Sequence, residues 1–133
     1  MSLDEPLLRG IHHVALICSD YPRSKAFYSA TLGLRIVREV YRDARDSWKC
    51  DLEVGPGVQL ELFSFPGAPP RPSWPEAQGL RHLAFAVADV EAAVAVLTAR
   101  GVACEPVRVD EHTGRRFVFF ADPDGLPIEL YEA

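Results

Sequence analysis

The sequence has few cysteines, no long apolar run and no excess of positive charge, and each absence excludes a class of protein. Its three cysteines, Cys18, Cys50 and Cys104, include no Cys-x-x-Cys pair, which indicates free thiols in a reducing cytoplasm. No apolar run is longer than Ala92–Leu97, whereas a membrane span requires roughly 18 residues. Because the first residues also lack a secretory pattern, we expect a cytoplasmic protein without a membrane partner.

The charge balance is acidic, with 14 Lys and Arg against 19 Asp and Glu and a net charge of −5. Proteins that bind nucleic acids normally carry a basic surface, so no nucleic-acid partner is expected. The chain has 133 residues, of which 48% are hydrophobic and 25% charged. These values predict one globular domain over residues 1–133.

An internal repeat organises the chain. The segment Ile11–Asp20 aligns without gaps on Leu80–Asp89, and this alignment places His13 on His82, 69 residues later. Self-similarity at a fixed spacing is the sequence signature of a duplicated structural unit. The chain therefore consists of two related modules.

The repeat continues to the end of each module, where Glu61 matches Glu129 at a spacing of 68 residues. One single-residue insertion in the helical segment reconciles the two spacings. We predict modules at about 10–64 and 79–132. Between them, residues 65–78 form a proline-rich linker, which could also act as a lid over a pocket.

Each module has the pattern of a strand, a helix and three further strands. Alternating apolar residues, helix-capping Asp residues and helix-ending glycines mark the boundaries. In the first module we predict strands at 11–18, 34–41, 47–54 and 58–64 and a helix at 22–31. In the second module we predict strands at 80–88, 104–109, 116–121 and 126–131 and a helix at 90–100.

Because side chains alternate along a strand, both repeated histidines and both repeated glutamates are predicted on the sheet face opposite the bulky apolar residues. Side chains of a strand point alternately to its two sides, and His13 and His82 share theirs with small residues. Glu61 and Glu129 point away from the apolar side of their strands. Imidazole and carboxylate ligands suit Ni²⁺, Fe²⁺, Mn²⁺, Co²⁺ or Zn²⁺.

Taken singly, each of these residues has an ordinary explanation as a polar side chain on a half-solvated strand. Their recurrence in register in both modules favours a shared role, and we predict one divalent metal ion. His12 and His112 are not expected to be ligands, since His12 points to the other side of its strand and His112 lies in a loop.

Taken together, these residues resemble the vicinal oxygen chelate superfamily, which includes glyoxalase I, extradiol dioxygenases and bleomycin-resistance proteins. The chain is most similar to small bacterial glyoxalase-like, or lactoylglutathione-lyase-like, proteins. The resemblance rests on Ile11–Leu16, Lys25–Tyr28, Leu32–Leu34, Leu60–Leu62, Leu80–Phe85 and Asp122–Tyr131.

The resemblance implies an α+β fold with two tandem βαβββ modules. Their strands would form a curved, open eight-stranded mixed sheet, a half-barrel with two helices on its convex face. It also implies that His13, Glu61, His82 and Glu129 are the metal ligands. Two positions differ from glyoxalase I, where an Arg and an Asn hold glutathione: here they are Ile17 and Phe65, which counts against glutathione use.

The implied activity is that of a metal-dependent lyase or isomerase that acts on a small carbonyl or hydroxycarbonyl compound. Glu129, and with it Glu61, would carry the proton as a general base. Arg45 and Trp48 are candidates for substrate binding at the cavity rim, although a solvated strand pair would explain their segment equally well.

Two other functions remain open. An Fe(II) extradiol-type dioxygenase would use His13, His82 and Glu129 as a facial triad, although a fourth ligand at Glu61 speaks against it. A non-catalytic protein that binds a metal or a small molecule is the other alternative. Whichever function applies, a homodimer is expected, because relatives in this superfamily often form dimers.

Overall fold

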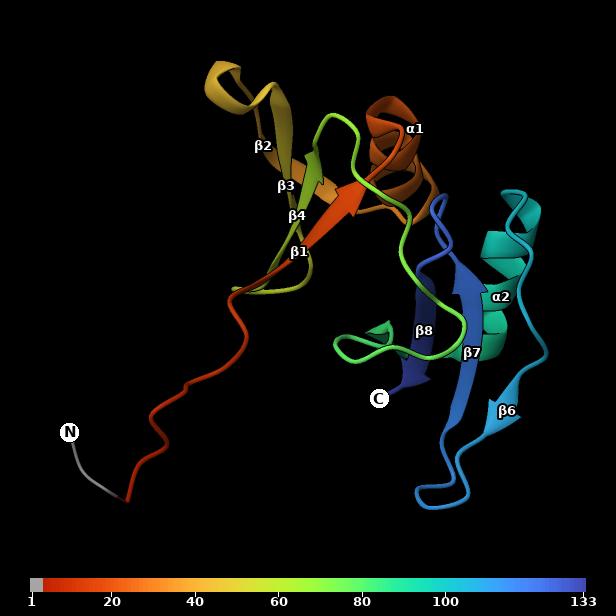
Figure 1. Ribbon diagram of the computed structural model, residues 1–133. Coiled ribbons are helices and arrows are strands. Elements are labelled where there is room, and N and C mark those ends of the chain that lie inside the picture. Colours follow the sequence, from red (N-terminus) through yellow and green to blue (C-terminus); the bar gives the residue numbers. More distant parts are fainter. Residues whose placement is uncertain (1–3) are drawn as a thin grey trace. The chain divides into compact units, whose positions relative to one another are not determined.

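The computed structural model describes residues 4–133 (Figure 1). The first repeat folds as β1 (His13–Cys18), α1 (Tyr21–Ala26), η1 (Phe27–Thr31), β2 (Arg35–Arg42), η2 (Asp43–Arg45), β3 (Ser47–Glu53) and β4 (Gln59–Ser64). The second repeat folds as β5 (Leu83–Val87), α2 (Val90–Ala99), β6 (Arg108–Val109), β7 (Arg116–Ala121) and β8 (Pro127–Glu132). The predicted order of a strand, a helix and three strands is confirmed in both repeats.

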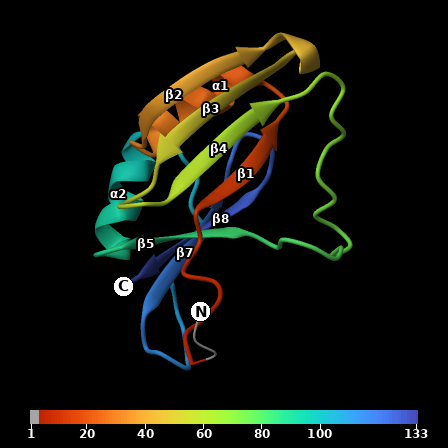
Figure 2. The same cartoon turned by 90° about the vertical axis from the view of Figure 1, so that its left-hand side faces the viewer.

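The first sheet has the strand order β1-β4-β3-β2, which can be followed in Figure 2. Strand β1 runs parallel to β4, whereas β3 is antiparallel to both β4 and β2. Glu61 on β4 is paired with Ala15 on one side and with Asp51 on the other. Directly paired residues point to the same face of a sheet. On the opposite face Leu60 and Leu62 are buried.

The second sheet repeats this arrangement with the order β5-β8-β7-β6. Glu129 on β8 is paired with Ala84 and Phe119, so it occupies the position that Glu61 has in the first sheet. Strand β6 is shorter than the predicted segment 104–109. Pro106 explains the difference, because proline has no backbone N–H to donate to a neighbouring strand.

The helices begin and end close to the predicted residues. The side chain of Asp89 accepts a hydrogen bond from the backbone N–H of Ala92, 3.1 Å away, and caps the start of α2. The helical segment of the first repeat runs through α1 and η1 to Thr31, and its last turns widen into a π-helix. Gly33 follows with φ of 77°, a left-handed conformation that glycine adopts without strain.

The chain divides into two compact units whose boundaries differ from those of the repeats. Among the described residues, the first unit contains 4–21 and Leu34–Ala68, and the second contains Pro22–Gly33 and Pro69–Ala133. The helical segment of the first repeat therefore belongs to the same unit as the second sheet.

Three contacts hold this helical segment in the second unit. The ring of Phe27 lies 6.3 Å from that of Phe120 in β7. The buried Tyr28 donates its hydroxyl to the carboxylate of Asp122 at 2.7 Å. The Arg100 side chain donates to the backbone carbonyl of Thr31. The apolar core that these contacts extend consists of Val90, Leu97, Val118, Phe120, Ile128 and Leu130.

The predicted α+β fold is confirmed: residues 4–133 form two βαβββ modules, with two α-helices and eight strands in open, mixed sheets. Hydrogen bonds join the strands into two four-stranded sheets. Among residues 4–133, no helix is long and apolar enough to cross a membrane.

Candidate functional site

The first predicted ligand pair lies on neighbouring strands of the first sheet. His13 opens β1 and Glu61 lies near the middle of β4, with His13 Nδ1 3.6 Å from Glu61 Oε2. The two strands are parallel, and their register brings the two residues to adjacent positions on the same face. At 3.6 Å the two atoms are too far apart for a good hydrogen bond, and His13 Nδ1 lies closer to His12 Nδ1, at 2.9 Å.

The second pair has the same separation in the second sheet but presents the other ring nitrogen of its histidine. His82 directly precedes β5, Glu129 lies in β8, and His82 Nε2 is 3.6 Å from Glu129 Oε1. The two glutamates are similarly buried, with 14% of the Glu61 side chain and 15% of the Glu129 side chain exposed. The predicted equivalence of the two pairs is therefore visible in their local geometry.

The chemistry and spacing of each pair fit a divalent metal ion. Metal–ligand distances of about 2.0–2.2 Å place two tetrahedral ligands of one ion roughly 3.4 Å apart. Both pairs have an imidazole nitrogen and a carboxylate oxygen at nearly this separation. No group of three or more His, Cys, Asp or Glu side chains suited to a metal occurs within the described part of the chain. The joining of both pairs on one ion thus stays a prediction.

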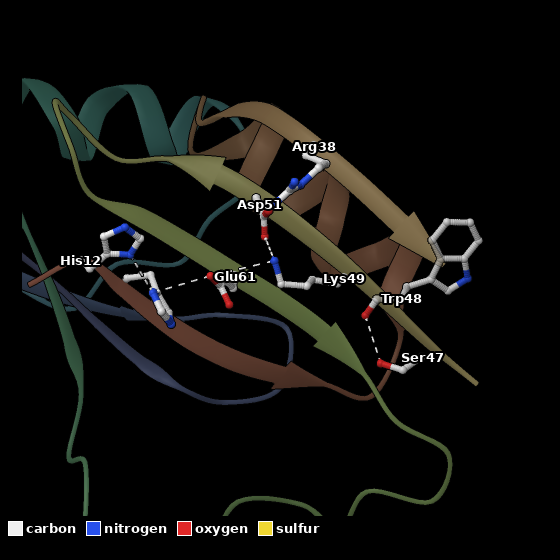
Figure 3. A network of polar contacts seen from close by, with 8 residues as sticks. His12, Arg38, Ser47, Trp48, Lys49, Asp51 and Glu61 are labelled. Carbon is white, nitrogen blue, oxygen red and sulfur yellow. Dashed lines mark hydrogen bonds and ion pairs between the residues drawn. The ribbon is translucent and has the colours of Figure 1, made fainter. Parts of the chain in front are cut away.

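A charged network continues from Glu61 across the first sheet (Figure 3). The ammonium group of Lys49 lies 3.9 Å from Glu61 Oε2 and 2.6 Å from Asp51 Oδ1. Asp51 is almost completely buried, and its second oxygen accepts a hydrogen bond from Arg38 Nε at 3.3 Å. A buried carboxylate is costly unless it is paired. Lys49 and Arg38 supply that pairing, and Lys49 also links Asp51 to Glu61.

The surroundings of Glu129 are aromatic instead. Phe119 is paired with Glu129, and its ring meets the His82 ring edge-on with centroids 5.0 Å apart. The guanidinium of Arg108 lies over the rings of Phe117 and Phe119, 5.0 and 5.5 Å from their centroids. Within residues 4–133, no Lys or Arg forms an ion pair with Glu129.

A pocket of about 730 Å³ opens beside His82 in the second unit. Its wall includes the end of the proline-rich segment, from Arg71 to Arg81, and Phe119 and Arg108 also line it. This volume lies in the range of about 300–1,000 Å³ that is usual for small-molecule sites. Part of the predicted linker therefore forms the wall of a cavity.

The two predicted substrate residues lie in the first unit but in different surroundings. Arg45 lies in η2, and its guanidinium is 5.0 Å from the centroid of Phe65. Trp48 neighbours Lys49 in β3 and so points to the opposite face, where it stacks on Tyr21 at 5.5 Å. Burial and the hydrogen bond from its hydroxyl to Glu39 raise the pKa of Tyr21.

Sequence reasoning missed three residues that contact the first pair or its network. Lys49 and Asp51 were not assigned to the site, because basic and acidic residues alternate in their segment and this pattern is typical of solvated strands. His12 was assigned to the other side of its strand, yet β1 begins only at His13. His12 directly precedes β1, and its Nδ1 lies 2.9 Å from His13 Nδ1. The one available signal was the His-His pair itself.

Comparisons with known proteins agree with this architecture. Residues 10–130 match the model of the Glyoxalase/Bleomycin resistance protein/Dioxygenase superfamily. The chain is 59% identical over 125 residues to an uncharacterized protein of Escherichia coli (strain K12), YaeR, with 94% of this chain and 97% of that protein covered.

Two further relatives have descriptive names. A 2-epi-5-epi-valiolone epimerase from an Actinomyces species is 31% identical over 142 residues, with 91% of this chain and 78% of that protein covered. The crystal structure of a glyoxalase family protein from Enterococcus faecalis is 48% identical and has a TM-score of 0.86, with 93% of this chain and 98% of that chain covered. With its duplicated βαβββ modules and the match over residues 10–130, the chain belongs to the glyoxalase/bleomycin resistance protein/dioxygenase superfamily.

Proposed function

We propose that the protein is a divalent-metal-dependent lyase or isomerase that moves a proton at a carbon next to a carbonyl group. The observation that carries this proposal is the pair of His–Glu sites, each with a nitrogen–oxygen distance of 3.6 Å and each at the same position of its repeat. One ion would be held by His13, Glu61, His82 and Glu129. Two neutral imidazoles, two carboxylates and a 2+ ion sum to zero charge, which a partly buried site tolerates.

When bound, such an ion supplies Lewis acidity, which polarises a substrate oxygen and acidifies the neighbouring C–H. The protein's own residues would then move the proton. Glu129 is the better general base of the two glutamates, because no ammonium or guanidinium group pairs with it in the described residues. Glu61 is held by Lys49 at 3.9 Å and would serve mainly as a fixed ligand.

The substrate proposed for this site is a small carbonyl or hydroxycarbonyl compound rather than a glutathione adduct. Ile17 and Phe65 are apolar where glutathione-binding relatives need an Arg and an Asn. The relative named as an epimerase supports proton transfer, since inverting a carbon centre commonly requires removal and return of its proton.

We further propose that the protein acts as a homodimer. His13 and Glu61 belong to one compact unit, and His82 and Glu129 belong to the other. A common ion can therefore take one pair from each of two copies or both pairs from one chain. Mixing the variants His13→Ala and His82→Ala separates these cases. Activity that is partly restored in the mixture indicates a site shared between two chains.

The proposed reaction is tested by solvent exchange. Protein loaded with Ni²⁺, Co²⁺, Mn²⁺ or Zn²⁺ is incubated in heavy water with a panel of α-hydroxyketones, and loss of the α C–H signal is followed by NMR. We expect metal-dependent exchange that falls at least about 100-fold in Glu129→Gln, since a general base contributes roughly 10²–10⁴-fold. Glu111→Gln is the matched control, because the Glu111 side chain is 86% exposed in a loop.

Two results would contradict the proposal. Exchange that is as fast in Glu129→Gln as in Glu111→Gln would remove Glu129 from the reaction. Oxygen uptake with catechols in the Fe²⁺-loaded protein, without any solvent exchange, would favour a dioxygenase instead.

A further inference from the structure

Two arginines lie on the face of the first sheet that carries Glu61, named here the Glu61 face (Glu61, Phe63, Phe65 and Lys49). The guanidinium of Arg42 is 5.0 Å from the centroid of Phe63 and 5.7 Å from that of Phe65. The guanidinium of Arg45 is 5.0 Å from the centroid of Phe65. The two aromatic rings are themselves stacked, with centroids 5.8 Å apart. Together they form a platform under two positive charges.

Neither arginine has a carboxylate partner in the part of the chain that the structure describes. Among residues 4–133, the ion pairs of the first sheet engage Arg35, Arg38 and Lys49 but not Arg42 or Arg45. Arg42 donates one hydrogen bond, from Nη2 to Ser47 Oγ at 3.1 Å. Its Nε atom is buried and has no hydrogen-bond partner among the described residues. A buried donor without a partner is costly, and one explanation for such a donor is an ion or water that binds there.

We propose that Arg42 and Arg45 form an oxyanion-binding site that holds a phosphate or carboxylate group of the substrate. This inference rests on the proposed function, because it assigns a substrate class to the same sheet face. Guanidinium groups present several N–H donors in a plane and bind carboxylates and phosphates in a bidentate way. Stacking on Phe63 and Phe65 fixes the two planes while leaving donors at their edges free.

The distance from this site to Glu61 sets the size of the substrate. Residues two apart on one strand are separated by about 6.5–7 Å, so Phe63 lies roughly 7 Å along β4 from Glu61. An anion bound by the arginines beside this ring and a carbonyl group beside Glu61 would belong to a molecule at least about 7 Å long. The proposed substrate is therefore a phosphorylated or carboxylated carbonyl compound with several bonds between its two ends.

General electrostatic attraction does not explain anion binding by this protein. Its net charge is −5, so the molecule as a whole repels anions. Lys49 and Arg38, the other cations on this face, are both paired with Asp51, at 2.6 and 3.3 Å. A saturable anion site in the first unit would accordingly depend on Arg42 and Arg45.

The test uses the full chain without added metal, because phosphate also binds metal ions. Inorganic phosphate is titrated into the protein by calorimetry, and acetate is titrated in parallel to distinguish phosphate from carboxylate recognition. We expect saturable binding at millimolar phosphate, about tenfold weaker in Arg42→Gln and in Arg45→Gln. Arg35→Gln is the matched control, because Arg35 lies in the same sheet and is paired with Glu53.

A second measurement needs no variant, in case Arg42→Gln fails to fold. Phenylglyoxal modifies arginines, and peptide mapping of the wild-type protein gives the rate at each residue. Phosphate should slow the modification of Arg42 and Arg45 at least about threefold more than that of Arg35, because a bound anion shields the donors it contacts. Equal protection of all three arginines, or no saturable binding of either anion, would overturn the proposal.

Both readouts are independent of turnover. Phosphate binding that depends on Arg42 and Arg45 in a protein without exchange activity would leave the anion site standing and reject the lyase or isomerase. Exchange activity without arginine-dependent anion binding would do the reverse.

Discussion

The two His–Glu pairs occupy equivalent positions in the two sheets but have different surroundings. Glu61 is paired across the strands with Asp51, and Glu129 is paired with Phe119. Around Glu61 the neighbours are charged and linked to one another through Lys49. Around Glu129 they are aromatic rings, with Arg108 stacked on them. Both repeats have a His–Glu pair at the same strand positions, whereas the residues next to these pairs differ in type.

This difference teaches how a duplicated fold can give two like residues unlike tasks. A carboxylate beside an ammonium group is held in place as an anion, because opposite charges at about 4 Å attract even near a protein surface. A carboxylate among aromatic rings has no such anchor and is freer to move. The comparison therefore supports the proposal that Glu61 would be the fixed ligand and Glu129 the general base.

The largest expected effect is the loss of metal binding when either pair is broken. We expect His13→Ala and His82→Ala each to weaken binding of one Zn²⁺ or Ni²⁺ by roughly 10²–10³-fold, since four ligands share about 10–16 kcal/mol in structural zinc sites. Calorimetric titration measures the affinity and the number of ions per chain. His112→Ala, at an exposed loop position, should bind as the wild type does. Loss in only one of the two histidine variants would mean that the pairs do not share an ion.

The next effect concerns the charged network, which only the first sheet has. Lys49→Met leaves the buried Asp51 with Arg38 alone, and we expect a loss of about 3 kcal/mol in the free energy of unfolding. Urea denaturation measures it. In the double variant Lys49→Met and Asp51→Leu much of this loss should be recovered, because no uncompensated charge remains buried. Additive losses in the double variant would show that the two residues are not coupled.

A smaller effect is expected from the aromatic counterpart in the second sheet. Phe119→Leu removes the edge-on contact with His82 and one of the rings under Arg108. The ring contact contributes about 0.5–1.5 kcal/mol and the cation–π contact about 0.5–1 kcal/mol, so the unfolding free energy should fall by roughly 1–2.5 kcal/mol. Urea denaturation of Phe119→Leu and Lys49→Met under the same conditions compares the two losses of unfolding free energy directly. A loss larger than that of the lysine variant would reverse the order of importance proposed for the two faces.

The smallest effect is a pH dependence at a turn of the second unit. The backbone N–H of His112 and the hydroxyl of Tyr131 donate to Asp110 and lower the pKa of its carboxyl group. The resulting stabilisation is present above the unfolded-state pKa of about 3.9 and is lost as the pH falls through the lower folded-state value. Asp110→Asn should therefore flatten the melting temperature against pH below about pH 4. An unchanged acid profile would contradict this assignment.

The predictions from sequence succeeded where short-range periodicity decides the structure. The alternation in β1 predicts that Val14 and Leu16 face away from His13, and their lower exposure bears this out. Strand β6 fell short of its predicted length, because the apolar pattern took no account of Pro106. The contact of Phe27 with Phe120 joins the helical segment of the first repeat to the second sheet, and no local pattern in the sequence identifies that partner.

The amino-acid sequence by itself determined the duplication, the order of the strands and helices, and the shared face of each histidine and glutamate, because these follow from the repeat and from the alternation of side chains along a strand. Only the tertiary structure decided which neighbours surround each pair. The link from Lys49 to Asp51 and Glu61, and the stacking of Arg42 on Phe63, depend on the register between strands that are distant in the sequence. That register is fixed by cross-strand packing and hydrogen bonding, which no local pattern encodes.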